Sequence, residues 1–236
     1  MTTKQLSIPL GNETIYLDTS IWGDSKIVFI NVHENEQTSV AAGQEILSNT
    51  GGILIELKSK GDRLISFASN GIQYTFDPNR IFSAAGIKAS LLEFGPYDPE
   101  IEKQIATLAA TIIETILSYH PTIIIALHNT TGDYSMNNYI PGGKLENDKS
   151  DIFINPQMNN ADLFFTTDKE AFDLIKNGGF NVVLQNNENV TEDGSLSVYC
   201  SANGLRYINI EALHGHKNEQ MQMITFINNA LAQTFG

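Results

Sequence analysis

Apolar residues follow two patterns along the chain, and their alternation predicts a succession of strands and helices. Uniformly apolar runs at Lys26–Val32 and Thr122–Leu127 are typical of strands covered on both faces of a sheet. Apolar residues recur at helical spacing over Thr38–Asn49 and Pro99–Tyr119. The alternation predicts an α/β protein, a three-layer α/β/α sandwich with a mixed, mostly parallel central sheet.

Shorter patterns complete this prediction. Strands are expected at the sheet edge over Glu13–Asp18 and, further along, at Gly52–Lys58, Arg63–Ala68, Gln73–Phe76, Asp162–Thr166 and Asn181–Gln185. Ser195–Ser201 and Leu205–Ile210 are expected to form a hairpin-like pair of strands, and further helices are expected over Lys169–Asn177 and His216–Gln233. The polar segment Asn129–Asn160 predicts a long loop, and long loops in compact domains are usually functional.

Composition and charge narrow the classes of function. The 236 residues, 42% hydrophobic and 17% charged, fit one globular domain over 1–236, and no repeat or linker divides the chain. A net charge of −13 argues against a nucleic-acid or anionic-membrane partner, because such partners need a basic face. It does not exclude an anionic substrate held by local arginines.

The sequence carries little information about the cellular compartment of the protein. The single Cys200 excludes an internal disulfide framework. No apolar run approaches the ~20 residues of a membrane span, and Met1–Leu10 lacks the apolar core of a signal peptide. A cytoplasmic location is the default expectation, although a removed leader peptide would leave the same sequence.

Polar side chains at strand ends supply candidate chemistry. His33 follows the first apolar run, and Glu36 lies three residues later. An imidazole and a carboxylate at this spacing can turn toward one zinc ion, with bond lengths of roughly 2.0–2.2 Å. Glu34 competes with Glu36 for the metal, but the spacing of Glu36 from His33 suits a shared tetrahedral site better.

His128 and Glu211 also follow apolar strands directly. Because the carboxyl ends of parallel strands meet at one edge of a sheet, both are expected to converge with His33 on one crevice. Two imidazoles and two carboxylates suffice for a His₂Glu zinc site with an open position and a separate base. A rival site has the same spacing at His216 and Glu219, and His214 is a further candidate for the pocket.

Four short motifs with this order and spacing resemble the zinc carboxypeptidase family and its relatives, the succinylglutamate desuccinylase and aspartoacylase group. They are H-E-N-E at 33–36, D-P-N-R at 77–80, the apolar strand that ends in His128, and N-I-E at 209–211. Together they span most of the chain. The resemblance implies the three-layer fold predicted above and a zinc-dependent enzyme.

The resemblance also assigns roles to particular residues. It implies one zinc ion with the ligands His33, Glu36 and His128; a general base, Glu211; an arginine that polarises the scissile carbonyl, Arg63; and three substrate-binding residues, Asn79, Arg80 and Tyr199. The implied reaction is hydrolysis of an amide bond next to a free carboxylate, on a small peptide or an N-acyl amino acid.

Alternatives remain open at this stage. The chain is shorter than a typical carboxypeptidase catalytic domain, and Ile81-Phe82 after the Asn-Arg pair is closer to the deacylase relatives. Peptide and N-acyl amino acid substrates are therefore both retained, as is a catalytically silent homologue that binds zinc. Structural alternatives also exist for Arg80, which could pair with Asp77; for Arg63, as an exposed strand residue; and for Tyr199, as a packing aromatic.

Overall fold

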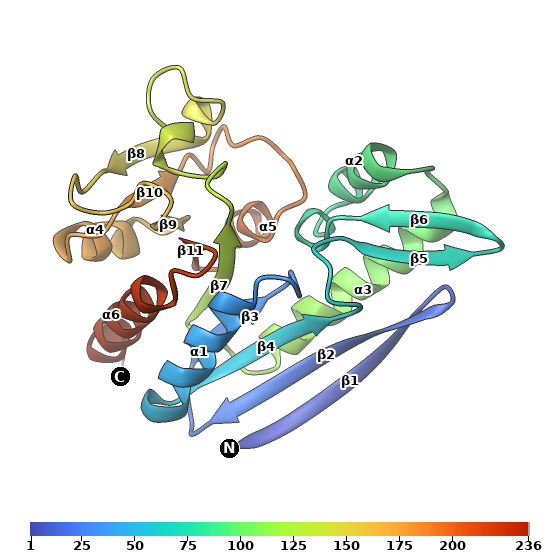
Figure 1. Ribbon diagram of the computed structural model, residues 1–236, viewed down its shortest axis with the longest axis horizontal. Helices are drawn as coiled ribbons and strands as arrows, with labels where there is room; N and C mark the ends of the chain where they lie inside the picture. Colours follow the sequence, from blue (N-terminus) through green and yellow to red (C-terminus); the bar gives the residue numbers. More distant parts are fainter. Residues whose placement is uncertain (236) are drawn as a thin grey trace.

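The computed structural model describes residues 1–235 and the side chains up to Leu231 (Figure 1). Its strands are β1 (Thr2–Leu10), β2 (Glu13–Trp22), β3 (Ile27–Asn31), β4 (Gly52–Lys58), β5 (Ile65–Ser69), β6 (Ile72–Phe76), β7 (Ile123–Thr130), β8 (Lys149–Phe153), β9 (Leu163–Thr166), β10 (Val182–Gln185) and β11 (Tyr207–Leu213). Its α-helices are α1 (Gln37–Thr50), α2 (Ala84–Phe94), α3 (Pro99–Leu117), α4 (Lys169–Asn177), α5 (Leu196–Ala202) and α6 (Lys217–Phe235), and short 3₁₀ turns include η1 (Pro78–Arg80).

One large sheet carries the fold, with the strand order β1-β2-β4-β3-β7-β11-β9-β10-β8. Its centre is parallel, because β4, β3, β7 and β11 run side by side in one direction. The outer pairs β1–β2, β2–β4, β11–β9 and β10–β8 are antiparallel, whereas β9 and β10 are parallel. The mixed α/β architecture is confirmed, and the predicted parallel character holds for the centre of the sheet and for the pair β9–β10, whereas the other pairs are antiparallel.

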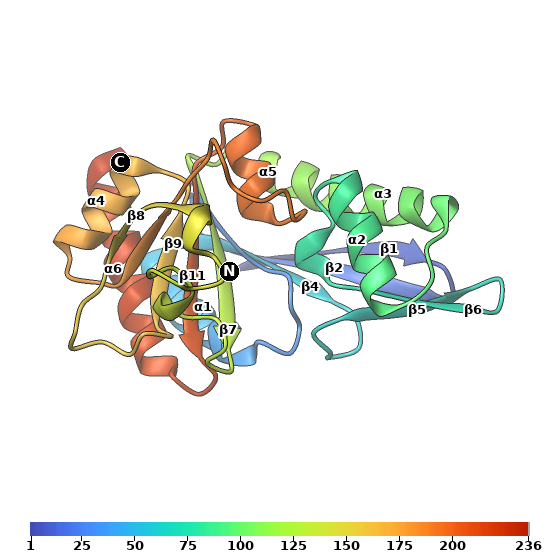
Figure 2. The ribbon, with the colours of Figure 1, turned by 90° about the horizontal axis from the view of Figure 1, so that it is seen from above.

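Helices cover both faces of this sheet. On one face, α3 and α5 pack through residues such as Ile105 and Cys200 against Val28 and Ile124. On the other face, α1, α4 and α6 pack through residues such as Leu47 and Ile224. Figure 2 shows that α2, α3, β5 and β6 extend to one end of the molecule, together with β1 and β2, opposite the end that holds β8, α4 and α6. The apolar runs at β3 and β7 form strands because both faces are buried, as predicted.

Four local predictions need correction. Glu13–Asp18 is part of β2, which lies inside the sheet because the mostly exposed β1 pairs with it and forms the edge. Leu196–Ala202 is helix α5 rather than a strand, since Leu196 and Cys200 bury one helical face. The edge strand β8 lies within the predicted loop. Helix α2, capped by the Ser83 side chain, was not predicted.

The long polar segment after β7 has a small apolar cluster of its own. Met136 and Tyr139 pack on Leu163, Phe165 and Val183, on the same side of the sheet as α3. The cluster fixes the segment as a wall over β9 and β10. No helix in the described residues is long and apolar enough to cross a lipid bilayer.

Candidate active site

Three central strands carry the candidate residues at or near their carboxyl ends. β3, β7 and β11 are parallel neighbours, as convergence of the strand ends requires. His33 follows β3 by two residues. His128 and Glu211 lie within β7 and β11 rather than beyond them, directly opposite each other in register. Register pairing points both side chains to the same face of the sheet.

The turn between β3 and α1 holds Glu36 in place. Glu36 occupies the N-cap position of α1, but its carboxylate makes no capping hydrogen bond. Its backbone is fixed instead, because Ser39 Oγ donates to the Glu36 carbonyl at 2.7 Å and Asn129 Oδ1 accepts from the Ser39 amide at 2.8 Å. Gln220 Nε2 donates to the His128 carbonyl at 3.0 Å. The Glu36 side chain is therefore free to point toward the imidazoles.

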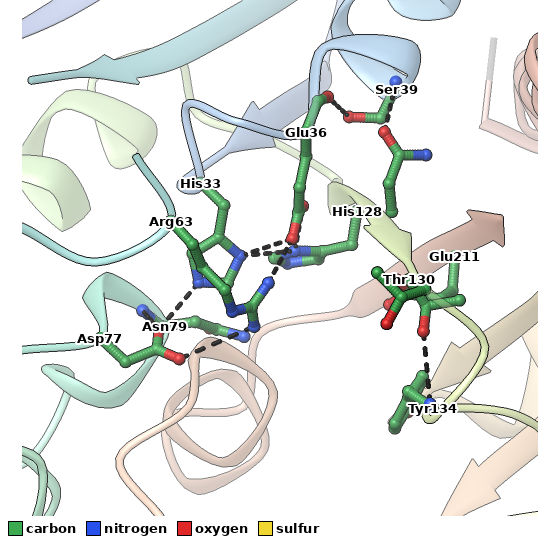
Figure 3. A network of polar contacts seen from close by, with 12 residues as sticks. His33, Glu36, Ser39, Arg63, Asp77, Asn79, His128, Thr130, Tyr134 and Glu211 are labelled. Atoms are coloured by element: carbon green, nitrogen blue, oxygen red, sulfur yellow. Dashed lines mark hydrogen bonds and ion pairs between the residues drawn. The ribbon is translucent and has the colours of Figure 1, made fainter. Parts of the chain in front are cut away.

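His33, Glu36 and His128 form a tight buried cluster (Figure 3). The two oxygens of Glu36 lie 2.9 Å from His33 Nδ1 and 2.9 Å from His128 Nδ1. The two Nδ1 atoms are 3.2 Å apart. One nitrogen from each ring and one carboxylate thus face a common point, as a metal site requires.

Asp77 and Arg63 surround this cluster. Asp77 Oδ1 accepts from His33 Nε2 at 2.8 Å and from the Asn79 amide at 2.8 Å. Because Asp77 engages Nε2, the Nδ1 atom of His33 is the one left for the cluster. Arg63 Nη1 donates to Glu36 Oε1 at 2.6 Å, and its Nη2 lies 3.7 Å from Asp77 Oδ2. Arg63 therefore points into the site and is not a simple exposed strand residue.

The surroundings of the cluster keep its two carboxylates, Glu36 and Asp77, ionised. Burial would raise the pKa of Glu36, but the imidazoles of His128 and His33 outweigh it and hold the pKa well below its usual range. Burial would likewise raise the pKa of Asp77, which His33 and Arg63 hold well below its usual range. Burial lowers the pKa of His128. Against its own burial, the pKa of His33 is raised by Glu36 and Asp77.

Glu211 is the other buried carboxylate of the site, and its environment acts in the opposite direction. It is 7% exposed, and its Oε2 accepts from Asn209 Nδ2 at 3.3 Å. Burial raises the pKa of Glu211 well above its usual value, and the nearby Glu36 carboxylate adds to the effect. Two carboxylates with pKa values driven in opposite directions are typical of acid–base sites.

The raised pKa of Glu211 predicts a pH-dependent stability of the metal-free protein. The folded protein holds this proton more tightly than the unfolded chain, so the stabilisation is fully present below the ordinary carboxyl pKa and is lost as pH rises through the folded pKa. We expect Glu211→Gln to become progressively more stable than the native protein as pH rises from mildly acidic to alkaline.

Urea unfolding of both metal-free proteins across that pH range measures this difference directly. Glu56→Gln is the matched control, because Glu56 is also buried but pairs with Lys58 at 2.7 Å on β4. A stability difference between Glu211→Gln and the native protein that does not change with pH would contradict the assignment.

Asn79 and Arg80 lie on η1 at the opposite side of the site. Asn79 Oδ1 accepts from the Leu196 amide at 3.2 Å, which leaves the Asn79 amide nitrogen as a donor. Arg80 does not pair with Asp77. Its Nη1 lies 3.5 Å from Asp193 Oδ2, with both side chains well exposed, so this ion pair is loose.

Close backbone packing sets the position of Asp193. A Cβ on Gly86 would lie 2.4 Å from Gly194 Cα and 2.6 Å from the Arg80 carbonyl, so only glycine fits there. Gly194 itself has a φ of +74°, which glycine adopts without strain. This contact holds the segment before α5 against η1.

The site opens into a cavity of about 520 Å³. The metal-ligand candidates His33, Glu36 and His128 line it, together with Glu211, Arg63, Asn79 and Arg80. Tyr134 and Tyr139 of the long polar segment form part of its wall, and their hydroxyls are 2.7 Å apart. Tyr199 does not line the cavity. It lies on α5 with its ring 6.3 Å from that of Phe82, so the prediction that it covers the substrate is not supported by its position.

The competing candidates have other partners. Glu34 Oε2 accepts from the backbone amides of Ser59 and Gly61 at 2.6 and 2.8 Å, which makes it a loop-fixing residue. His216 Nδ1 lies 2.9 Å from Asp162 Oδ2. Among the described residues, the only group with metal-site geometry is His33, Glu36 and His128. His214 does line the cavity, as the sequence had suggested.

Several cavity residues were given no role from the sequence, among them Tyr134, Gln185 and Asn209, the first residue of the N-I-E motif. Asn209 is two residues before Glu211 on β11, and the period of 2 in a strand could have indicated that both face the same way. Gln185 lies on β10 and carries no comparable local signal.

Comparisons with known proteins support the fold. No family model matches the sequence, and no curated protein sequence matches it. Among solved structures, the chain is similar to murein-tripeptide amidase MpaA from Escherichia coli O157, at 13% identity over 96% of this chain and 91% of that chain, with a TM-score of 0.52. An aspartoacylase family protein from Mesorhizobium loti aligns at 12% identity over 95% of this chain and 66% of that chain, with a TM-score of 0.46. At the level of the fold, the resemblance to the zinc carboxypeptidase group is confirmed.

Proposed function

We propose that this protein is a zinc-dependent hydrolase that cleaves an amide bond next to a free carboxylate. One observation carries the proposal: three candidate metal-ligand side chains, a buried carboxylate with a raised pKa and two arginines all line one cavity. A catalytically silent homologue would have no physical reason to keep Glu211, Arg63 and Arg80 on the same cavity as the ligand set.

The ligand set fits a zinc ion. With the His33 Nε2 proton directed at Asp77, a neutral His33 presents a lone pair to Glu36 at 2.9 Å and to His128 Nδ1 at 3.2 Å. In the metal-free protein, protons on the imidazoles satisfy these contacts with Glu36, and a bound zinc ion would take their place. Two imidazole nitrogens and one carboxylate are the protein ligands of a catalytic zinc site with an open fourth position. Asp77 would orient His33 from outside the ligand set, as such carboxylates do in zinc proteins.

The other residues of the cavity take the remaining roles in hydrolysis. When bound, zinc would supply Lewis acidity that polarises the scissile carbonyl and activates water. A carboxylate with a raised pKa is a stronger base than an exposed one, so Glu211 suits removal of a proton from the attacking water and its delivery to the departing amine. Arg63, beside Glu36, would stabilise negative charge that develops on the carbonyl oxygen.

Arg80 and Asn79 would bind the carboxylate of the substrate. Arg80 Nη1 donates to the Asn79 carbonyl at 2.9 Å, and the loose ion pair with Asp193 can be exchanged for a pair with another carboxylate. A guanidinium grips a carboxylate through two parallel hydrogen bonds, and Asn79 adds a donor from the same turn. In a chain of net charge −13, this local attraction must overcome long-range repulsion of an anionic substrate.

The cavity also supports a second candidate, deacylation of N-acyl amino acids. The cavity has a volume of about 520 Å³, which suits a small substrate, and residues of the long polar segment form part of its wall. Both reactions use the same residues and release an amino acid as the departing amine; they differ only in the acyl group that accepts the water oxygen, a peptidyl group in one and a small acyl group in the other.

The decisive experiment combines metal analysis with a substrate screen. We expect about one zinc ion per chain in the purified protein. We also expect hydrolysis of peptides with a free carboxyl terminus or of N-acyl amino acids, and this hydrolysis should stop when a chelator is added and return with added zinc. The two substrate series identify which candidate applies. Hydrolysis that survives complete removal of metal would overturn the zinc-dependent mechanism, and stoichiometric zinc without turnover of either series would favour the silent homologue.

Substitution of Arg80 tests the carboxylate site. Arg80→Lys should raise KM for substrates with a free carboxylate by an amount equivalent to about 1.5–3 kcal/mol, the range for a hydrogen bond to a charged group. Amidated or esterified analogues should be poor substrates of the native protein and lose little more in the variant. Steady-state kinetics on matched free and amidated substrates gives both values.

Arg206→Lys is the control for this experiment. Arg206 donates two hydrogen bonds to Asp168, at 2.7 and 2.9 Å, and does not line the cavity. Its replacement should leave KM unchanged. Equal loss with charged and neutral substrates in Arg80→Lys would mean that Arg80 has a structural role.

A further inference from the structure

A carboxylate of the protein itself lies against the arginine to which we assign the substrate carboxylate. Asp193 Oδ2 is 3.5 Å from Arg80 Nη1. Both residues line the cavity, and their side chains are 38% and 40% exposed, so a ligand in the cavity can reach them. One guanidinium carries one positive charge, so the carboxylate of Asp193 and that of a substrate would share it.

The backbone around Asp193 is fixed by several contacts with the segment that follows η1. The Phe82 amide donates to the Gly194 carbonyl at 2.9 Å. Glu192 Oε1 accepts from Ser83 Oγ at 3.0 Å and from the Gly194 amide at 2.9 Å. Together with the close packing of Gly86 on Gly194, these contacts fasten residues 192–194 to the start of α2. The position of Asp193 beside Arg80 is therefore set by the fold.

The local turn explains an acceptor at position 193 but not its negative charge. Asp193 Oδ1 accepts from the Ser195 amide at 2.9 Å, and an asparagine oxygen makes the same turn equally well. The exposed ion pair with Arg80 contributes little to stability. The charge therefore acts chiefly on Arg80, by lowering the attraction of its guanidinium for any further carboxylate.

We propose that Asp193 is an internal competitor for Arg80, an autoinhibitory carboxylate that the carboxylate of a substrate displaces on binding. The inference rests on the proposed function in that it takes Arg80 to bind that carboxylate. While Asp193 pairs with Arg80, the apparent affinity for the substrate falls in proportion to the fraction of molecules in which Arg80 is accessible. An incoming carboxylate gains from the exchange because it can offer two oxygens to the guanidinium in place of one loose contact.

The same competition acts on the product. The amino acid released by hydrolysis keeps its carboxylate, so it occupies Arg80 until it dissociates. The return of Asp193 to Arg80 favours that dissociation. The internal carboxylate thus weakens the binding of substrate and of product by the same factor.

Removal of the charge alone tests the competitor. Asp193→Asn keeps the acceptor for the Ser195 amide and loses the carboxylate. We expect KM for substrates with a free carboxylate to fall by about 3- to 10-fold, with no rise in kcat. Amidated analogues of the same substrates should change by less than about 2-fold, because they do not compete with a carboxylate for Arg80. Steady-state kinetics on the matched pairs gives these values.

Two further variants separate competition at Arg80 from a general change of charge. Glu192→Gln removes one negative charge from the neighbouring residue, which does not line the cavity, and should leave KM unchanged. In an Arg80→Gln background, the gain in kcat/KM from Asp193→Asn should disappear, since the two residues act on each other. An equal fall of KM in Glu192→Gln and Asp193→Asn would overturn the competitor. So would a rise of KM in Asp193→Asn, which would make Asp193 a positioning residue for Arg80.

A binding measurement distinguishes failure of the competitor from failure of the proposed function. Calorimetric titration with 4-methylpentanoate and with its amide reports on the carboxylate site without hydrolysis. Asp193→Asn should bind the carboxylate about 3- to 10-fold more tightly than the native protein and bind the amide equally well. Tighter binding without hydrolysis of any substrate would overturn the hydrolase and retain the competitor. Unchanged or absent binding of 4-methylpentanoate in both proteins would overturn the competitor, whether or not substrates are hydrolysed.

Discussion

Turnover by Glu211→Gln is expected to fall by roughly 10²-fold or more while the bound zinc is retained, because the variant removes a general base and no metal ligand. The substitution is nearly isosteric, and the new amide oxygen can still accept from Asn209 Nδ2. The neutral side chain also relieves the repulsion from Glu36 that helps raise the pKa of Glu211. A selective loss of kcat is therefore expected, without loss of the fold.

Steady-state kinetics and metal analysis of the same preparation check this result. Glu56→Gln is again the control. Glu56 lies on β4, accepts a hydrogen bond from Gln44 of α1 at 3.0 Å, and does not line the cavity. It should retain both zinc and activity. Loss of zinc together with activity in Glu211→Gln would indicate instead that the carboxylate orients a ligand.

Removal of either imidazole of the proposed ligand set, His33 or His128, should have the second large effect, on zinc binding. His33→Ala and His128→Ala are each expected to abolish stoichiometric zinc and all zinc-dependent hydrolysis, because a site with three protein ligands loses one third of its donors. Zinc content after dialysis, with hydrolysis of the best substrate, measures the effect. His216→Ala is the control, since its ring pairs with Asp162 and should leave zinc unchanged.

Both imidazoles are more deeply buried than strand-end loops would suggest, with 0% exposure for His33 and 5% for His128. Alanine at either position leaves a void and frees Glu36 from its partners, so His33→Asn and His128→Asn should be tested beside the alanine variants, with thermal melting as the check on folding. Full zinc retention in both pairs of variants would contradict the ligand set and direct attention to His214.

Local sequence determined the elements whose signals are self-contained. β3 and β7 are uniformly apolar, and a run of this kind is stable only when both faces are covered. Helix α3 begins at Pro99 after the capping side chain of Asp98, and α4 begins after Asp168, which caps it in the same way. The order of the four motifs also indicated which polar residues would meet, and His33, Glu36, His128, Glu211, Arg63, Asn79 and Arg80 do line one cavity.

Tertiary structure decided the elements whose local pattern is ambiguous or weak. Ser-Leu-Ser-Val-Tyr-Cys-Ser over 195–201 alternates as a strand would, but Leu196 and Cys200 are also one helical turn apart, and their burial against the core selects the helix. That choice carries Tyr199 away from the cavity. β1 is mostly exposed and is defined by backbone pairing with β2, a partner that periodicity does not reveal.

The chemistry of the site divides in the same way. Sequence alone identified the residues that carry charge and the motif positions they occupy. Their pKa values depend on burial and on neighbours far along the chain: Asp77 lies against His33, and Glu211 lies within the field of Glu36. Burial and long-range contacts arise from the assembled sheet, so no local pattern in the sequence could supply them.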